Sequence, residues 1–206
     1  MRELGLRSKL SKKFKVTTDS KHNYLVVENV LDRGFAVDRP SKVWVSDITY
    51  IQTKEGFLYL TTILDLYDRK MIGWSLSNGM NTEETTLAAW KMAIRNRTVQ
   101  KGLIFHSDRG VQYANKKITN TIESFDVIRS MSRKGNCWDN AVAESFFKSL
   151  KTELIYGNKL ITKQQMELEI FEYIEIWYNK KRRHDALNYK TIEEYNNQNN
   201  IYKNVA

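Results

Sequence analysis

The sequence predicts an α/β protein in which a mixed five-stranded sheet is flanked by helices. Two observations carry this prediction. Three segments rich in β-branched and aromatic residues, 43–51, 57–66 and 71–76, follow one another with only short turns between them, which is the pattern of an antiparallel meander. Helical and short apolar segments then alternate, as expected where helices cover the faces of a sheet.

The elements can be placed in chain order. Residues 54–56 and 67–70 supply the turns of the meander. Thr82 stands where the N-cap of the first helix is expected. The elements after the meander are a helix, a strand, a helix, a strand and two helices, placed at residues 82–96, 102–106, 116–124, 127–131, 139–154 and 162–180. This order is that of the ribonuclease H-like fold.

The composition fits a folded protein with a polyanionic partner. Hydrophobic residues make up 41% of the 206 residues, enough for a core. A formal charge of +9 favours nucleic acid as the partner. Cys137 is the only cysteine, so no internal disulfide or cysteine-based zinc site can form. Without a signal peptide or a membrane-spanning run, we expect a cytoplasmic protein with no membrane partner.

Three carboxylates stand out by position. Asp47 lies in the middle of the first strand among apolar neighbours, where a charge is costly unless it is compensated. Asp108 follows the strand at 102–106, where open α/β sheets collect functional groups. Glu144 lies on the helix at 139–154. Three converging carboxylates repel one another unless cations neutralise them, and oxygen ligands suit Mg²⁺ or Mn²⁺. Two such ions can assist both oxygens in phosphoryl transfer.

The helix at 139–154 carries a polar stripe. At 100° per residue, the side chains of Asn140, Glu144, Lys148 and Lys151 share one face. The simpler interpretation is an amphipathic helix with a Glu–Lys pair four residues apart. The functional interpretation is that Asn140, Lys148 and Lys151 contact DNA, with the two cations holding its phosphates beside Glu144.

Other polar residues have mainly structural interpretations. Asp65 and Asp68 could neighbour Asp47 across the sheet, but we interpret both as structural. Asp139 is expected to stabilise the helix N-terminus. His106 is expected to be packed and hydrogen-bonded rather than to act at the site. Cys137 is expected to be inert because no neighbour would lower its pKa.

Four motifs carry a family resemblance. They are WVSDITYI (44–51), IFHSDRGVQY (104–113), SRKGNCWDNAVAESFFKSLKTE (132–153) and YIEIWYNKKRRHDALNY (173–189). The chain resembles the DDE transposases of bacterial insertion sequences, of the IS-three type, whose core is related to that of retroviral integrases. The 35 residues between Asp108 and Glu144 match the spacing of that superfamily. Lys151 matches the basic residue that completes its signature.

The resemblance implies a site, a reaction and partners. Asp47, Asp108 and Glu144 would bind Mg²⁺ or Mn²⁺, as two ions. Lys148 and Lys151 would contact transposon-end DNA. The family cuts DNA with water and then joins a 3′-hydroxyl to target DNA, without a covalent protein–DNA intermediate. An upstream helix-turn-helix protein, separate or fused by frameshifting, and a homo-oligomer are the expected partners.

The basic cluster near the C-terminus has two interpretations. Its members are Lys180, Lys181, Arg182, Arg183 and His184. Cations at a helix C-terminus stabilise the helix dipole, and a run of five also suits phosphate contacts. Asn188 and Ile192 depart from the resemblance, because many relatives have glycine and proline there. The asparagine-rich residues 196–200 are expected to fray.

Three regions are expected: residues 1–39 as a basic arm or the remnant of a small helical unit, 40–157 as an integrase-like catalytic core, and 158–206 as a basic helical extension. Two other functions remain open. A ribonuclease H-type or resolvase-type nuclease would share the acidic cluster, although the Asp108–Glu144 spacing with Lys151 is not expected of it. A truncated DNA-binding remnant would need a partner for activity.

Overall fold

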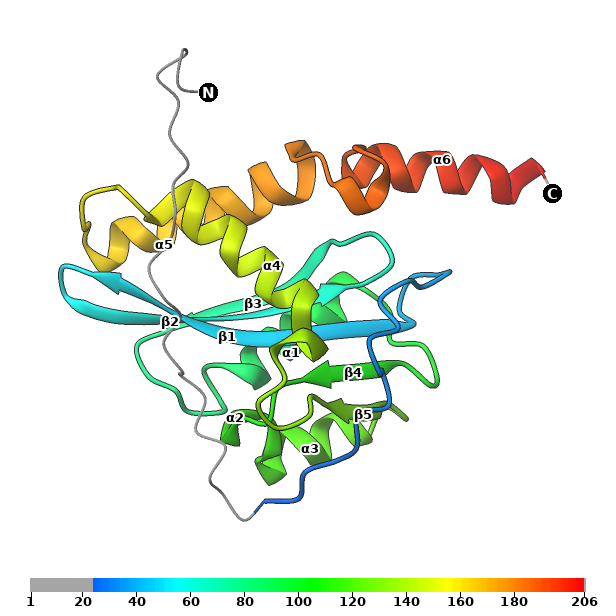
Figure 1. Cartoon of the computed structure of the whole chain (residues 1–206), viewed down its shortest axis with the longest axis horizontal. Coiled ribbons are helices and arrows are strands. Elements are labelled where there is room, and N and C mark those ends of the chain that lie inside the picture. Colours follow the sequence, from blue (N-terminus) through cyan, green and yellow to red (C-terminus); the bar gives the residue numbers. More distant parts are fainter. Residues whose placement is uncertain (1–23, 206) are drawn as a thin grey trace.

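A computed structural model describes residues 24–205, in which a sheet lies between two layers of helices (Figure 1). The sheet has five strands in the order β3-β2-β1-β4-β5. Strands β1, β2 and β3 form the antiparallel meander, and β4 and β5 run parallel to β1. The strands are β1 Val43–Thr53, β2 Gly56–Asp65, β3 Met71–Ser77, β4 Ile104–Ser107 and β5 Ile128–Met131. The predicted mixed five-stranded sheet is confirmed.

The helices cover both faces of this sheet. Helices α1, α2 and α3 lie on one side, and α4 and α5 lie on the other (Figure 1). Two long helices change pitch: α4 continues into the π-helical turn η2, and α5 continues into the π-helical segment η3. The bounds are α1 Thr86–Asn96, α2 Val111–Ala114, α3 Lys116–Glu123, η1 Cys137–Asn140, α4 Ala141–Leu150, η2 Lys151–Ile155, α5 Lys163–Phe171, η3 Glu172–Lys181, η4 Asp185–Leu187 and α6 Ile192–Val205.

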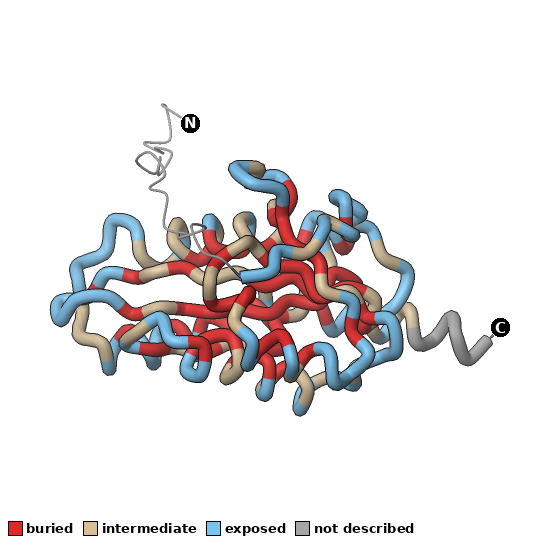
Figure 2. Tube along the Cα trace, turned by 90° about the horizontal axis from the view of Figure 1, so that it is seen from below, coloured by how far each residue is buried: buried red, intermediate tan, exposed pale blue. Residues whose placement is uncertain are grey.

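The alternation of side chains along β1 builds two cores. Successive side chains of a strand point to opposite faces. Val43 and Val45 are buried on the side of α4, whereas Trp44 is buried on the side of α1. The Trp44 ring centroid lies 5.6 Å from that of Trp90 in α1. Figure 2 shows the buried positions running through the middle of the molecule, with exposed positions around them. The central strand is therefore covered on both faces.

Gly73 allows α1 to lie close against β3. A Cβ atom at this position would lie 2.3 Å from the main-chain oxygen of Ala89 and 2.8 Å from the Cβ of Ala93. Backbone atoms cannot give way as a flexible side-chain end can, so a larger residue would push the helix off the sheet. The small residues on both surfaces thus fix this helix–sheet contact.

The segment after residue 157 forms part of the core. Ile170 and Ile174 are fully buried in the same apolar cluster as Val45 of β1. The Asn179 side chain accepts a hydrogen bond from the Met71 main-chain nitrogen and donates one to the Met71 oxygen, both at 2.9 Å. This amide pairs with the start of β3 as a neighbouring strand would. The long helix α5–η3 is thereby held against the sheet.

Two expectations about helix ends are wrong. The N-cap of α1 is Thr85, not Thr82, because residues 82–85 form a turn before the helix. The residues expected to fray, 196–200, belong to α6. Asn196 donates a hydrogen bond of 2.9 Å to the Asp68 carboxylate, and Asn199 donates one of 2.8 Å to the Tyr67 hydroxyl. These tertiary contacts stabilise α6, whose asparagine-rich composition alone does not favour a helix.

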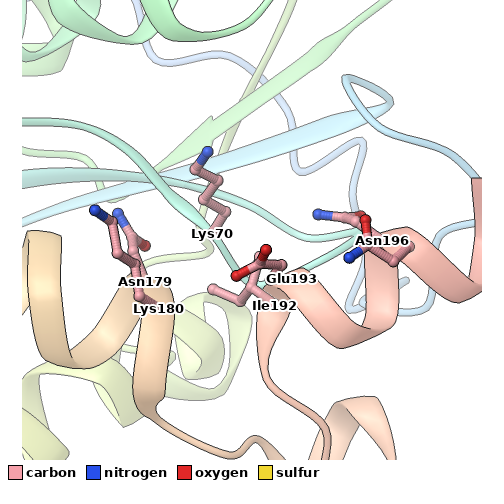
Figure 3. Close-up of a pocket in the computed structure, with 7 residues that line it drawn as sticks. Lys70, Asn179, Lys180, Ile192, Glu193 and Asn196 are labelled. Atoms are coloured by element: carbon pink, nitrogen blue, oxygen red, sulfur yellow. The ribbon is translucent and has the colours of Figure 1, made fainter.

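A surface pocket of about 420 Å³ lies where α6 meets the end of η3 and the turn between β2 and β3 (Figure 3). The residues that line it are Lys70, Asn179, Lys180, Ile192, Glu193, Asn196 and Asn197. None of the three candidate carboxylates is among them.

The described part of the N-terminal region, residues 24–39, contains no helix or strand. It follows the edge of β5, where the Met131 nitrogen donates to the Glu28 oxygen at 3.3 Å. The interpretation as a helical remnant therefore does not apply to residues 24–39, and the rest of the predicted arm, residues 1–23, lies outside the described residues. No helix within residues 24–205 is both long and apolar enough to cross a membrane.

Candidate active site

The parallel pairing of β1 and β4 places Asp47 and Asp108 side by side. Val45 and His106 are register partners in this pairing. Asp47 and Asp108 each lie two residues further along, beyond the last paired position. Two carboxylates at the same distance from a shared register pair, one on β1 and one just after β4, lie at the same edge of the β1–β4 pairing and on the same face.

The backbone around each aspartate orients its carboxylate. The Ile48 nitrogen donates a hydrogen bond of 2.8 Å to Asp47 Oδ1. The Gly110 nitrogen donates one of 2.9 Å to Asp108 Oδ1. A Cβ at Gly110 would come within 3.0 Å of that oxygen and 3.1 Å of Gln112 Oε1. Glycine therefore lets the Asp108 carboxylate lie over the start of α2.

Glu144 comes to the same region from the helical layer. It lies in the first turn of α4 and is partly exposed, and burial raises its pKa. The pKa of Asp47 is raised well above its usual value by burial and by the negative charges of Asp108 and Glu144. Negative charges add to the shift caused by burial only when they lie close to the carboxylate. The structure thus brings the three predicted acids together.

The donors at this edge are carboxylate oxygens, which suit hard divalent cations such as Mg²⁺ and Mn²⁺. Within residues 24–205, no three acidic, histidine or cysteine side chains are arranged as a ready metal site. The repulsion that raises the Asp47 pKa is nevertheless the kind that a bound cation relieves. The carboxylate donors are therefore chemically suited to a divalent metal, although their side chains are not arranged as a closed coordination site.

The two predicted lysines lie differently. Lys151 is half-buried beside the site, with its Nζ 5.2 Å from the ring centroid of Tyr50. Burial lowers its pKa, and the charge of Asp47 opposes that shift. Lys148, one turn earlier on α4, is exposed to solvent. Lys151 therefore faces the carboxylates, whereas Lys148 can reach a ligand outside them.

Asn140 does not lie on the exposed stripe where we expected a DNA contact. Its residue is 4% exposed, and its Nδ2 donates a 3.1 Å hydrogen bond to the Ser46 main-chain oxygen. Its buried Oδ1 has no hydrogen-bond partner among the described residues. Asn140 holds the start of α4 against the strand that carries Asp47, and its contact with DNA stays a prediction.

The C-terminal basic cluster is also divided. Lys180, Lys181 and Arg183 are exposed. Arg182 is partly buried and lies over the Tyr178 ring, at 5.8 Å from its centroid. His184 is 4% exposed, packs edge-on against the Tyr178 ring at 4.9 Å, and has its pKa lowered by burial. The His184 ring therefore packs in the interior, and its contact with DNA stays a prediction that this position does not favour.

The structural interpretation of Asp65 and Asp68 is confirmed. Both are buried, and both pair with Arg97 at 2.7 Å. Asp65 also accepts a 3.1 Å hydrogen bond from the Trp44 indole. In the β1–β2 register Asp65 stands opposite Trp44, and Asp47 stands opposite Thr62. Asp65 therefore lies beside the start of β1, whereas Asp47 lies further along the strand, and the Asp65–Asp68 pair is neutralised by Arg97.

Asp139 has a different structural role from the one expected. Its buried carboxylate accepts hydrogen bonds from Arg33 Nε at 2.9 Å and from Arg133 Nε at 2.8 Å and NH2 at 2.7 Å. These partners, Arg133 first, hold its pKa well below the usual value. Asp139 is thus part of an ion-pair cluster and does not stabilise the helix N-terminus as expected.

The expectation that His106 is packed and hydrogen-bonded is confirmed. Its ring lies between Ser130 and Ser132, and burial lowers its pKa to about 4.

Sequence reasoning missed the polar support beneath Asp47. The Ser46 hydroxyl and the Tyr113 hydroxyl are 2.7 Å apart and fully buried. Burial, and then the charges of Asp47 and Asp108, raise the pKa of Tyr113 well above its usual value. The only signal in the sequence was that Ser46 precedes Asp47 and that Tyr113 closes the motif containing Asp108.

The chain matches a family of known domains over two segments. The integrase core domain family matches residues 37–137 and again residues 144–199. These segments contain the strands, the loop after β4 and the helix that carry the three acids.

Curated relatives are similar over most of the chain. Transposase InsF of insertion sequence IS3A from Escherichia coli strain K12 is 40% identical over 199 residues, which cover 97% of this chain and 69% of that protein. A 31 kDa protein of insertion element IS600 from Shigella sonnei is 44% identical over 186 residues, 90% of this chain and 68% of that protein.

Solved structures share the fold at low sequence identity. The HTLV-2 integrase catalytic core in complex with magnesium has a TM-score of 0.55 at 16% identity, covering 76% of this chain and 96% of that one. The BIV integrase catalytic core has a TM-score of 0.53 at 16% identity, covering 79% and 98%. The ribonuclease H-like fold of the integrase cores is therefore the fold of this chain.

Proposed function

The chain belongs to the transposases of IS3-type insertion sequences, and we propose that Asp47, Asp108 and Glu144 perform its DNA cleavage and strand transfer with bound Mg²⁺ or Mn²⁺. Family membership makes it an enzyme that transfers polynucleotide strands during DNA integration. The assignment of the residues and of the metal is the proposal.

One observation carries this assignment. Burial, and then the charges of Asp108 and Glu144, raise the pKa of Asp47, although the three residues come from β1, the end of β4 and α4. Repulsion among carboxylates destabilises the folded protein, and such perturbed groups concentrate at functional sites. A structural carboxylate would be expected to have an ion pair that outweighs such repulsion, as Arg97 gives Asp65 and Asp68, whereas Lys151 offsets only part of the upward shift at Asp47.

The residues have distinct parts in the proposed reaction. Asp47 and Asp108 hold the metal at the sheet edge, and Glu144 completes the ligand set from the helix. Bound as two ions, the metal would activate the attacking oxygen and stabilise the leaving one in phosphoryl transfer. Lys151, half-buried near Asp47, offers its ammonium group to the phosphate that reacts.

Exposed cations outside the carboxylates would bind the DNA backbone. Lys148 on α4 and the cluster members Lys180, Lys181 and Arg183 are open to solvent. Phosphate contacts of this kind supply affinity without reading the base sequence.

We further propose that the active form is a homo-oligomer and that transposon ends are recognised by a helix-turn-helix segment or protein. A chain in a simian T-cell lymphotropic virus intasome shares the fold, with a TM-score of 0.56 at 15% identity over 75% of this chain and 54% of that one.

A strand-transfer assay tests the proposal. Labelled DNA carrying the ends of the insertion sequence is incubated with a target plasmid and Mg²⁺, together with the helix-turn-helix partner, and covalent joining is measured. We expect joining by the wild type and by Asp38→Asn, which changes a surface carboxylate paired with Lys42. We expect none from Asp108→Asn or Glu144→Gln. Hydrolysis only of RNA–DNA hybrids, or wild-type joining by Asp108→Asn, would refute the assignment.

A further inference from the structure

We propose that Trp138 is a stacking platform for an unpaired nucleobase of the DNA held at the carboxylates. This inference rests on the proposed function, because it needs DNA at that site. Trp138 is 69% exposed, more than any of the other four tryptophans. It makes no ring contact with the described residues. Stacking of a flat partner on this ring is favourable because it removes a large apolar surface from water.

Trp138 is exposed on an anchored backbone. It lies in the 3₁₀ turn η1, directly before two buried residues, Asp139 and Asn140. Asp139 is held by Arg33 and Arg133, and Asn140 by the Ser46 main-chain oxygen. The two neighbours therefore fix the position of η1 while the indole faces solvent. A pre-positioned ring loses little conformational entropy when a base stacks on it.

The anchors also place this loop between the carboxylates. At its start, the Ser132 main-chain oxygen accepts a 2.6 Å hydrogen bond from Arg109 Nε, and Arg109 directly follows Asp108. At its end, Asn140 reaches the residue that precedes Asp47. The loop of residues 132–140 thus connects both sides of the site, and α4 with Glu144 follows it.

The charge of the loop favours DNA over an apolar protein surface as the occupant. Lys134 is exposed and has no ion pair or hydrogen bond with the described residues. The carboxylate of Asp139 is neutralised by two arginines. An exposed aromatic ring near a lysine without an ion pair is a combination that binds single-stranded nucleic acid, in which bases stack and phosphates pair with cations.

The platform requires a base with a free face. In a duplex both faces of each base pair are already stacked, so only a frayed end, an overhang or an extruded nucleotide can stack on an indole. The proposed cleavage would leave a strand end beside the reacting phosphate, where the terminal nucleotide can unpair and expose a face. Stacking there would hold the strand in register with Asp47 and Asp108.

Binding of two DNA probes tests this inference without catalysis. One is a blunt duplex, and the other is the same duplex with a short single-stranded overhang that carries 2-aminopurine. Both are measured in Ca²⁺, with wild type, Trp138→Ala, Trp138→Phe and Leu168→Ala. Leu168 is the control because it is 67% exposed but lies on α5. Thermal unfolding checks that every variant is folded.

We expect Trp138→Ala to weaken binding of the overhang about tenfold, a stacking contribution of about 1.4 kcal/mol. Trp138→Phe should restore most of the loss, and Leu168→Ala should cause none. Blunt-duplex affinity should stay at the wild-type value, and the 2-aminopurine fluorescence should fall only where residue 138 is aromatic. Equal affinity of wild type and Trp138→Ala for the overhang, or an equal loss on both probes, would overturn the inference. Failure of the carboxylate assignment would appear separately, as joining by Asp108→Asn.

Discussion

The side-chain amide of Asn140 donates a hydrogen bond of 3.1 Å to the main-chain oxygen of Ser46 and so ties the start of α4 to β1. Glu144 stands one turn beyond this bond, and Asp47 directly follows Ser46. A helical glutamate and a strand aspartate are therefore positioned by one polar contact between the two layers. Together with the apolar packing of α4 on β1, the bond fixes the helix that carries Glu144 against the strand that carries Asp47.

Asn140→Ala should impair strand joining more than DNA binding. The substitution leaves the Ser46 oxygen without its side-chain donor and should lower the free energy of unfolding by about 1–3 kcal/mol. Because α4 then moves relative to β1, the joining rate should fall by at least about tenfold, as for a misplaced catalytic group. Single-turnover joining and denaturant unfolding measure the two effects. Ser145→Ala, at an exposed position of α4, is the matched control, and an equal loss in both variants would contradict the positioning role.

Asp47→Asn should stabilise the protein while abolishing joining. Burial and two neighbouring carboxylates disfavour the charged form of Asp47 in the folded state. A neutral amide removes this repulsion, and we expect the free energy of unfolding to rise by about 1 kcal/mol in the presence of a chelator. Denaturant unfolding at neutral pH checks the sign. A loss of stability would show that the carboxylate is structurally required.

Arg97→Met should destabilise the fold without a specific effect on catalysis. Arg97 neutralises the buried carboxylates of Asp65 and Asp68, which would be left uncompensated. Removing one partner from a buried ionic cluster costs about 3–5 kcal/mol. The fraction that remains folded should join DNA at the wild-type rate per molecule. Normal stability with lost joining would instead place this acidic pair in the active site.

The Asp139 cluster should make stability depend on pH in the acid range. Hydrogen bonds from Arg133 hold the pKa of Asp139 below its usual value of 3.8, and Arg33 acts in the same direction. The unfolded chain then binds a proton that the folded chain does not, so this contribution is present at neutral pH and is lost as the pH falls below about 5. Asp139→Asn should flatten that part of the curve, measured by denaturant unfolding from neutral to acid pH. An unchanged slope would contradict the role of the cluster.

The exposed cations near the C-terminus should appear in the salt dependence of DNA binding. Replacing Lys180, Lys181 and Arg183 by glutamine removes three exposed charges. The slope of log affinity against log salt should decrease by about 0.9 for each phosphate contact that is lost. His184→Gln should leave the slope unchanged, because His184 is buried. An unchanged slope in the triple variant would assign these cations to the helix dipole alone.

The strands and the positions of Asp47 and Asp108 could be predicted from sequence because the signals are local. A dense run of β-branched residues marks β1, and the end of an apolar run marks the end of β4. The predicted position of the Asn140 side chain is wrong, because the sequence prediction assumes a continuous α-helix from residue 139 onward. Asn140 lies in the 3₁₀ turn η1, where 100° per residue no longer applies. Lys151 begins a π-helical turn, which also changes its direction.

The C-terminal region shows the same limit in another form. Its asparagine-rich sequence has little helix propensity, yet α6 forms because Asn196 and Asn199 bond to residues 67 and 68 of the β2–β3 turn. In the sequence, His184 is the last residue of a basic run and is interpreted as one more cation. In the structure, its ring packs against the Tyr178 ring in the interior. Such contacts join residues far apart in the chain and leave no periodic signal.

Calorimetric titration with Mn²⁺ tests the central claim most directly, because it measures the metal site without DNA. The wild type and the surface variant Asp38→Asn should bind Mn²⁺ alike, since Asp38 is exposed and pairs with Lys42 at the surface. Asp108→Asn should bind it at least about tenfold more weakly, because one of the few carboxylate ligands is gone. Identical binding by wild type and Asp108→Asn would contradict a metal site built from Asp47, Asp108 and Glu144.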